Sequence, residues 1–250
     1  MTKKKLSIFI GFDPREAACF AVAKNSAERL LTQPVPIKPL ILSDLRERGI
    51  YKRGMRHMVE YDESWRHVRT QMWDVPSDAP MSTEFACSRF LVPKLAGEGL
   101  ALFVDCDVMF RVNPLDVFRL HEEGKAVSCV KHRHVPTAAE KMDGQVQTRY
   151  ARKNWSSVMI FDCGHSAHAA LTDDMLANAP GRDLHAFSWL DDEYIGGLPA
   201  RWNYLVGHTV LPPAEEPAIV HWTDGAPCMK GFERVEYADE FNEELRLWAR

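Results

Sequence analysis

The sequence contains no apolar run of about 18 residues, the length that a helix needs to cross the hydrocarbon core of a bilayer. Three lysines precede an apolar stretch over residues 6–12, but Asp13 and Arg15 end that stretch early. A secretory signal requires a longer apolar region, so we expect neither a signal peptide nor a membrane-spanning segment. The predicted location is the cytoplasm, and any membrane contact is expected to be peripheral.

An excess of positive charge is also lacking, since 31 Lys and Arg residues stand against 35 Asp and Glu residues. The formal net charge is -4 at pH 7. Proteins that hold nucleic acid through its phosphates need a basic surface. Nucleic acid is therefore not a predicted partner.

Cysteine pairs of the CxxC type are absent, although the chain has six cysteines. That spacing is typical of zinc sites and redox couples. The scattered cysteines are therefore expected to be reduced and mostly buried. The sequence also has no internal repeat and no low-complexity segment, and its 250 residues are enough to bury a core in one domain.

Short apolar runs alternate with segments of helical character along the chain. Asp13 is placed to cap a helix that begins at Pro14, and the polar stretch 46–80 indicates loops and short helices over one end of the sheet. The alternation predicts an α/β fold with a mostly parallel sheet, whose sites lie beyond the strand ends. Strands are expected at 6–11, 37–42, 100–104, 127–130, 158–161 and 218–222, and helices at 15–31, 83–95, 167–176 and 237–248.

Two carboxylates, Asp105 and Asp107, follow the apolar run at residues 100–104. Two acids at the partly buried end of a strand repel one another unless a cation offsets the repulsion, and Mn²⁺ or Mg²⁺ prefers such oxygen ligands. The spacing lets both side chains reach one ion. The pair therefore indicates a divalent metal site, although an Asp-x-Asp can also be a surface feature that ends a strand.

His221 follows a second short apolar run and precedes Trp222. A single histidine at a strand end can equally be structural. If Asp105, Asp107 and His221 meet, however, they form a carboxylate and imidazole face with open positions for two phosphate oxygens, an arrangement that helps a nucleoside diphosphate to leave.

Six segments resemble, in order and rough spacing, those of the family eight glycosyltransferases, which include glycogenin and bacterial lipopolysaccharide galactosyltransferases. The similarity extends over residues 6–232, nearly the whole chain. The segments are IFIGFD at 8–13, RFLVPKL at 89–95, FVDCD at 103–107, NWSSVM at 154–159, WLDDE at 189–193 and HWTDG at 221–225.

The resemblance implies a GT-A fold, a Rossmann-like mixed sheet flanked by helices in a single domain. A donor-binding half is expected at about residues 1–110 and an acceptor or closing half at about 111–250. It also implies a UDP-sugar donor, a carbohydrate or glycolipid acceptor and transfer with retention of configuration. Residues 141–150 are polar and could form the acceptor side or a lid.

Site residues follow from the resemblance position by position. The turn of Gly11, Phe12 and Asp13 would hold the base and ribose, and Arg89 would reach the donor sugar or its phosphates. Mn²⁺ or Mg²⁺ would bind to the metal set named above. The remaining expected contacts to the donor are Ser156, Ser157, Asp191, Asp192, Gly225 and Lys230.

The chain departs from the family pattern at the two C-terminal segments. Gly225 stands one position late, and Lys230 is the nearest lysine to the position of the phosphate-binding lysine. Asp191 and Asp192 stand where the family has an Asp-Gln pair, so a carboxylate replaces an amide.

Two routes to retention are open. In the first, the metal and Arg89 stabilise charge on the departing UDP while the acceptor attacks from the same face. In the second, Asp192 forms a covalent glycosyl intermediate, as a carboxylate can.

Two other functions remain as alternatives. Phosphatases of the haloacid dehalogenase type also carry an Asp-x-Asp on a strand, although Met109 stands where they have a hydroxyl or a valine. The altered C-terminal segments would also suit a nucleotide-sugar-binding protein without turnover.

Overall fold

The computed structural model describes residues 4–62, 67–132, 152 and 154–249, and the segment 141–150 lies outside them. Its centre is a six-stranded sheet in the order β10-β8-β9-β6-β1-β2. In chain order these strands are β1 (Leu6–Gly11), β2 (Ile37–Leu40), β6 (Leu100–Val104), β8 (Val127–Cys129), β9 (Val158–Asp162) and β10 (Ile195–Gly197).

The sheet is mixed but mostly parallel, as the sequence predicts, because β9 alone among its six strands runs against the others. β1 runs parallel to β2 and β6, whereas β9 is antiparallel to both β6 and β8. An apolar run gives no strand direction, because a strand buried on both faces has the same pattern in either orientation. Strands from both halves of the chain share this sheet, and the fold is a single-domain α/β structure with a mixed sheet flanked by helices.

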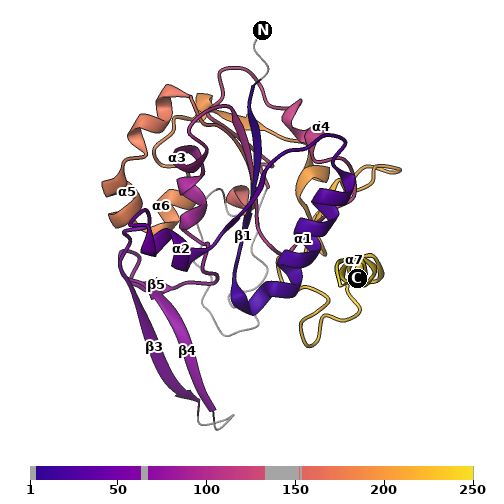
Figure 1. Cartoon of the computed structure of the whole chain (residues 1–250), viewed down its shortest axis with the longest axis horizontal. Coiled ribbons are helices and arrows are strands. Elements are labelled where there is room, and N and C mark those ends of the chain that lie inside the picture. The colour runs from indigo at the N-terminus through magenta and orange to yellow at the C-terminus, as the bar shows by residue number, and fades with distance from the viewer. Residues whose placement is uncertain (1–3, 63–66, 133–151, 153, 250) are drawn as a thin grey trace.

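The first strand leads into the helix as the sequence predicts. The Asp13 carboxylate accepts a hydrogen bond from the backbone N–H of Arg15 at 2.9 Å, which caps the 3₁₀ turn η1 (Pro14–Glu16) before α1 (Ala17–Leu30). Figure 1 shows α1 on one side of β1, with α7 (Ala238–Trp248) beyond it. No helix among the described residues is both long and apolar enough to span a bilayer.

A smaller sheet continues from the end of β6. The chain turns at Asp105–Asp107 into β7 (Val108–Phe110), which pairs antiparallel with β12 (Ile219–His221). In that register His221 stands opposite Val108, and the third strand is β11 (Tyr204–Leu205), parallel to β12. The step between the two sheets thus brings His221 to the turn that carries both aspartates.

Residues 46–80 differ from the sequence expectation. A β-hairpin made of β3 (Met55–Asp62) and β4 (His67–Asp74) projects from the body, and β5 (Ala79–Pro80) joins it at the base (Figure 1). Loops and short helices were the wrong prediction here. A two-stranded ribbon in solvent has no buried face to impose an alternation of apolar and polar residues, and Val59 on β3 is 67% exposed.

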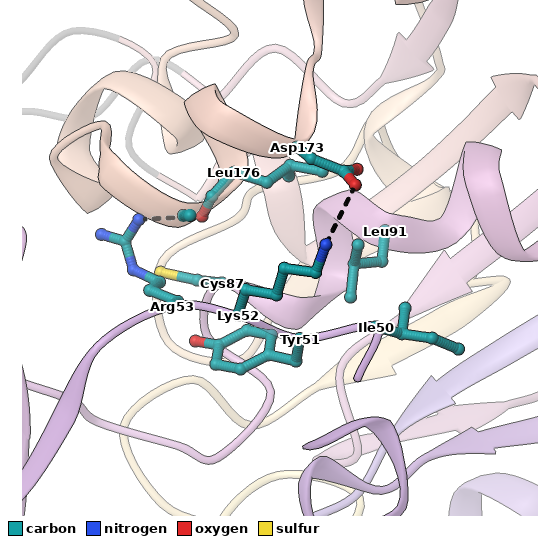
Figure 2. Close-up of a pocket in the computed structure, with 9 residues that line it drawn as sticks. Ile50, Tyr51, Lys52, Arg53, Cys87, Leu91, Asp173 and Leu176 are labelled. Atoms are coloured by element: carbon teal, nitrogen blue, oxygen red, sulfur yellow. Dashed lines mark hydrogen bonds and ion pairs between the residues drawn. The ribbon is translucent and has the colours of Figure 1, made fainter. Parts of the chain in front are cut away.

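A buried ion pair anchors the base of this hairpin. Arg53, 2% exposed, donates to both Asp74 carboxylate oxygens, at 2.5 and 2.6 Å. Figure 2 shows the same guanidinium directed at the Leu176 carbonyl, 3.1 Å from Nη1, in α5 (Asp173–Asn178). Beside it, the Lys52 side chain reaches toward Asp173 (Figure 2). The pair therefore ties the hairpin to the body of the protein.

Two predicted helices are broken into shorter pieces. Residues 83–95 form η2 (Ser88–Leu91) and α3 (Val92–Ala96), and Pro93 lies in the first turn of α3, where its missing N–H costs nothing. Residues 167–176 divide between η4 (Ser166–Ala170) and α5. The remaining helical turns are α2 (Leu42–Glu47), α4 (Leu115–Phe118), η3 (Trp155–Ser157), α6 (Gly181–His185), η5 (Asp192–Tyr194) and η6 (Ala200–Asn203).

Candidate metal and donor site

Asp105, Asp107 and His221 meet at the step between the two sheets. One ligand atom from each lies within 4.8 Å of the others, and His221 Nε2 is 3.3 Å from Asp107 Oδ1. The backbone fixes this meeting, because the Trp222 N–H donates to the Asp107 carbonyl at 3.0 Å. The predicted convergence of the three side chains is confirmed.

A chain of buried hydrogen bonds sets the tautomer of His221. Ser157 Oγ donates to the Asn154 carbonyl at 2.9 Å, so it accepts from Asn203 Nδ2 at 2.8 Å. The amide oxygen of Asn203 must then face His221 Nδ1, 2.8 Å away, and accept its proton. With the proton on Nδ1, the neutral ring directs the lone pair of Nε2 toward Asp107.

This arrangement fits a divalent cation. Adjacent donors of an octahedral ion with bonds of about 2.1 Å are separated by about 3 Å, close to the 3.3 Å between His221 Nε2 and Asp107 Oδ1. Metal-bound histidines ordinarily donate their second ring N–H to a fixed acceptor, and Asn203 supplies one here. Two carboxylates and one imidazole suit Mn²⁺ or Mg²⁺.

The negative charge of the two aspartates changes the pKa of His221. Burial disfavours the imidazolium, but the neighbouring carboxylates of Asp107 and Asp105 outweigh it and raise the pKa of His221 above its ordinary value. The two carboxylates therefore favour positive charge at this point.

Arg89 is buried beside the cluster and holds one of its ligands. Its Nη1 lies 2.7 Å from Asp105 Oδ1 and donates to the Ser156 carbonyl at 2.9 Å. The guanidinium also stands over the rings of Phe85 and Phe103, at 5.2 and 5.0 Å from their centroids. Arg89 therefore orients the Asp105 carboxylate from the wall of the site.

A cleft of about 480 Å³ opens over the cluster. It is large enough for a nucleotide-sized ligand. Eight of the residues predicted from the sequence line it, namely Arg89, Asp105, Asp107, Ser156, Ser157, His221, Gly225 and Lys230.

The other predicted residues lie elsewhere. Phe12 is half-buried against the Phe20 ring, with centroids 5.1 Å apart. Asp13 is fully buried, its carboxylate accepting from Arg15 and from the backbone N–H of Glu84 at 3.0 Å. A side chain on Gly11 would meet the Phe85 ring at 2.5 Å, so glycine lets that ring form the wall. The turn shapes the cleft from behind.

Asp191 and Asp192 are also not among the lining residues. The Asp192 side chain is 87% exposed and forms an ion pair with Arg152. The predicted contact of this pair with the donor sugar therefore stays a prediction.

The cleft residues that sequence reasoning missed include Glu16 and His185. Glu16 is the last residue of η1, and its carboxylate accepts from the Cys106 thiol at 2.8 Å. Burial, with the charge of Asp107, raises the pKa of Glu16 to about 7. The sequence could have indicated Glu16, because it comes soon after β1, and β1 and β6 are parallel and end at the same edge of the sheet. His185, whose Nδ1 lies 2.6 Å from Ser156 Oγ, follows no strand and gave no such signal.

Removing the Asn203 amide that holds His221 should weaken metal binding without abolishing it. We expect Asn203→Leu to lower Mn²⁺ affinity by about 10–100-fold, because the imidazole loses its fixed tautomer. Calorimetric titration of Mn²⁺ measures this, with Asn178→Ala on the exposed face of α5 as the control. Unchanged affinity in a folded Asn203→Leu variant would contradict the role given to the amide.

No family model matches the chain. The Protein CDI of Arabidopsis thaliana is 38% identical over 247 residues, which cover 97% of this chain and 87% of that protein.

Solved glycosyltransferase structures share the fold at much lower identity. The WbbM bifunctional glycosyltransferase in its apo form superposes with a TM-score of 0.61 at 13% identity, over 98% of this chain and 50% of that one. Galactosyltransferase LgtC, in complex with donor and acceptor sugar analogues, gives 0.56 at 14% identity, over 96% and 95%. The apo form of glycosyltransferase GlyE of Streptococcus pneumoniae gives 0.58 at 12% identity, over 99% and 62%.

The chain therefore spans about half of the WbbM structure and about two thirds to nearly all of the other two. Taken together with the sequence relationship, these findings show that the chain has the GT-A fold of family eight-type glycosyltransferases and belongs to the family of the Arabidopsis Protein CDI.

Proposed function

We propose that the protein is a metal-dependent glycosyltransferase that moves a hexose from a UDP-sugar to a hydroxyl of a carbohydrate or glycolipid, with retention of configuration. One observation carries the proposal: the cluster of Asp105, Asp107 and His221 lies at the floor of a nucleotide-sized cleft in a GT-A fold. The free, mostly buried cysteines suit work in the cytoplasm.

The residues of the cleft divide the proposed work among them. Asp105, Asp107 and His221 would hold Mn²⁺ or Mg²⁺, which when bound supplies positive charge for the diphosphate. Lys230 lines the same cleft and is the proposed lysine for a phosphate. Arg89 keeps Asp105 in place.

Different parts of the cleft are proposed to bind the nucleoside and the sugar of the donor. Gly11, Phe12 and Asp13 do not line the cleft and are proposed to support its nucleoside end from behind, Gly11 by admitting the Phe85 ring and Asp13 by holding the segment that begins at Glu84. Ser156 and Ser157 line the cleft beside the cluster and are proposed to face the donor sugar. The acceptor hydroxyl would enter from the open side.

A thermal-shift screen tests the proposed donor class. UDP, GDP, CMP and TDP sugars are compared with and without Mn²⁺, since a ligand at 100 times its dissociation constant stabilises the fold by about 2.7 kcal/mol. We expect UDP-sugars to raise Tm only in the presence of the metal. Equal shifts without metal, or none with any nucleotide sugar, would overturn the proposal.

The two routes to retention are separated by one substitution. The Asp192 carboxylate is exposed and paired with Arg152, so we expect Asp192→Asn to leave the rate of sugar transfer within about tenfold of the unchanged protein. A covalent route through this residue requires a far larger loss, because the nucleophile itself would be gone. Single-turnover transfer from the UDP-sugar identified in the screen measures the difference.

A nucleotide-sugar-binding protein without turnover is the second candidate. The observation that favours it is that Asp191 and Asp192 are not among the described residues that line the cleft. Binding of a UDP-sugar with metal, but no hydrolysis or transfer with any acceptor, would support it. The phosphatase alternative gains no support from a GT-A fold.

A further inference from the structure

Two cysteines from distant parts of the chain lie in contact beside the cleft. Cys19 is in the first turns of α1, and Cys228 is in the segment between β12 and α7. Their sulfur atoms are 3.4 Å apart. In Figure 1 this segment is drawn in gold and passes close to the lower end of α1.

The two thiols differ in exposure and in acidity. Cys19 is fully buried, whereas Cys228 is exposed. The hydrogen bond from Cys19 stabilises the Cys228 thiolate and lowers the pKa of Cys228 to about 7, while the pKa of Cys19 is raised by that hydrogen bond and by burial. The outer sulfur is thus the accessible nucleophile, and the inner one is placed to resolve an adduct formed on it.

The other cysteines lack this arrangement. Cys106 donates to Glu16 and Cys163 to its neighbouring carbonyl at Phe161. Burial raises the pKa of Cys87 to about 11 and that of Cys129 to about 12. These four thiols are buried and unreactive by comparison.

We propose that Cys19 and Cys228 are a thiol modification site that forms a reversible disulfide with a low-molecular-weight disulfide as oxidant. The Cys228 thiolate attacks the oxidant RSSR, which gives a mixed disulfide and releases RS⁻. Cys19 then attacks the Cys228 sulfur, and its proton leaves with the departing thiolate, which is released as RSH. In total, two protein thiols are oxidised and one RSSR is reduced to two RSH. The sulfurs need only close from 3.4 Å to about 2.05 Å.

The disulfide would restrain one wall of the cleft. The segment that carries Cys228 also contributes Gly225, Met229 and Lys230 to the cleft lining. Its backbone is held by local turns, such as the bond from the Met229 N–H to the Ala226 carbonyl at 2.8 Å. Such turns open more readily than a strand ladder. A covalent link to α1 therefore fixes the wall that bears Lys230.

Oxidation of the purified chain with excess glutathione disulfide tests the site directly. After alkylation of free thiols and proteolysis, mass spectrometry should find one cross-linked peptide pair, containing Cys19 and Cys228. Cys163→Ser, a buried cysteine outside the pair, should give the same cross-link. A persistent glutathione adduct on Cys228, or a link to another cysteine, would overturn the proposal.

Hydrogen exchange tests the consequence for the cleft wall. On oxidation we expect hydrogen exchange at the backbone amides of residues 226–232 to slow by about tenfold or more. In Cys228→Ser, a change at an exposed position, the same treatment should not slow hydrogen exchange of these amides. Cys19→Ser should also show no slowing. A cross-link that leaves these exchange rates unchanged would refute the restraint of the wall. Neither readout depends on nucleotide binding.

Discussion

Asp107→Asn should reduce turnover of the nucleotide-sugar donor by about three orders of magnitude. The carboxylate stands 3.3 Å from His221 Nε2 and belongs to the three-residue cluster. Asparagine keeps the shape but removes one negative charge, so the site loses affinity for the cation that would offset the charge of the diphosphate. Charge stabilisation of this kind is worth several kcal/mol, and about 4 kcal/mol corresponds to about 10³ in rate.

Hydrolysis of the donor and binding of Mn²⁺ are measured together for this variant. Asp116→Asn serves as the control, because that aspartate pairs with Arg119 on the surface, away from the cluster. We expect the control to match the unchanged protein in both assays. Full activity in folded Asp107→Asn would remove the metal role from this residue.

Asp74→Ala should lower the free energy of unfolding by about 3–5 kcal/mol. Arg53 and Asp74 are 2% and 3% exposed, and two hydrogen bonds join them directly. Removing the carboxylate leaves a buried guanidinium without its counter-charge, and that desolvated charge is the source of the cost. Urea denaturation followed by circular dichroism gives the value.

A double substitution distinguishes a buried charge from simple loss of packing. Arg53→Met with Asp74→Leu should recover most of the stability, because replacing both partners by apolar groups leaves no unpaired charge. Arg56→Ala is the control, since its pair with Asp78 is exposed and is expected to contribute less than about 1 kcal/mol. A double variant as unstable as the single one would contradict this account of the hairpin base.

The metal ligands could be predicted from sequence because each follows, precedes or ends a short buried strand. The apolar run at β6 fixed where Asp105 emerges, and β12 did the same for His221. The end of a buried strand can be recognised in a sequence by the change from apolar to polar residues. The resemblance implied their meeting, but the pairing of β7 with β12 that produces it is contained in no local pattern.

The supporting residues could not be predicted. Asn203 lies in a short 3₁₀ turn, and its contact with Ser157 spans a large sequence separation. A buried amide has no pattern in the sequence that separates it from a surface one. His185 likewise has no sequence pattern that marks it as a cleft residue. The β3–β4 hairpin was missed because residues such as Val59 are exposed, so no buried face imposes an alternation of apolar and polar residues there.

Binding of Mn²⁺ to the apo protein, followed by electron paramagnetic resonance, tests the central claim most directly. The account predicts about one tightly bound Mn²⁺ per chain, with binding lost in Asp105→Asn and in His221→Ala and retained in the Asp116→Asn control. It also predicts that UDP tightens this binding, because the diphosphate supplies further oxygen ligands. Equal binding by all four proteins, or none by the unchanged chain with or without UDP, would contradict a metal site built from Asp105, Asp107 and His221.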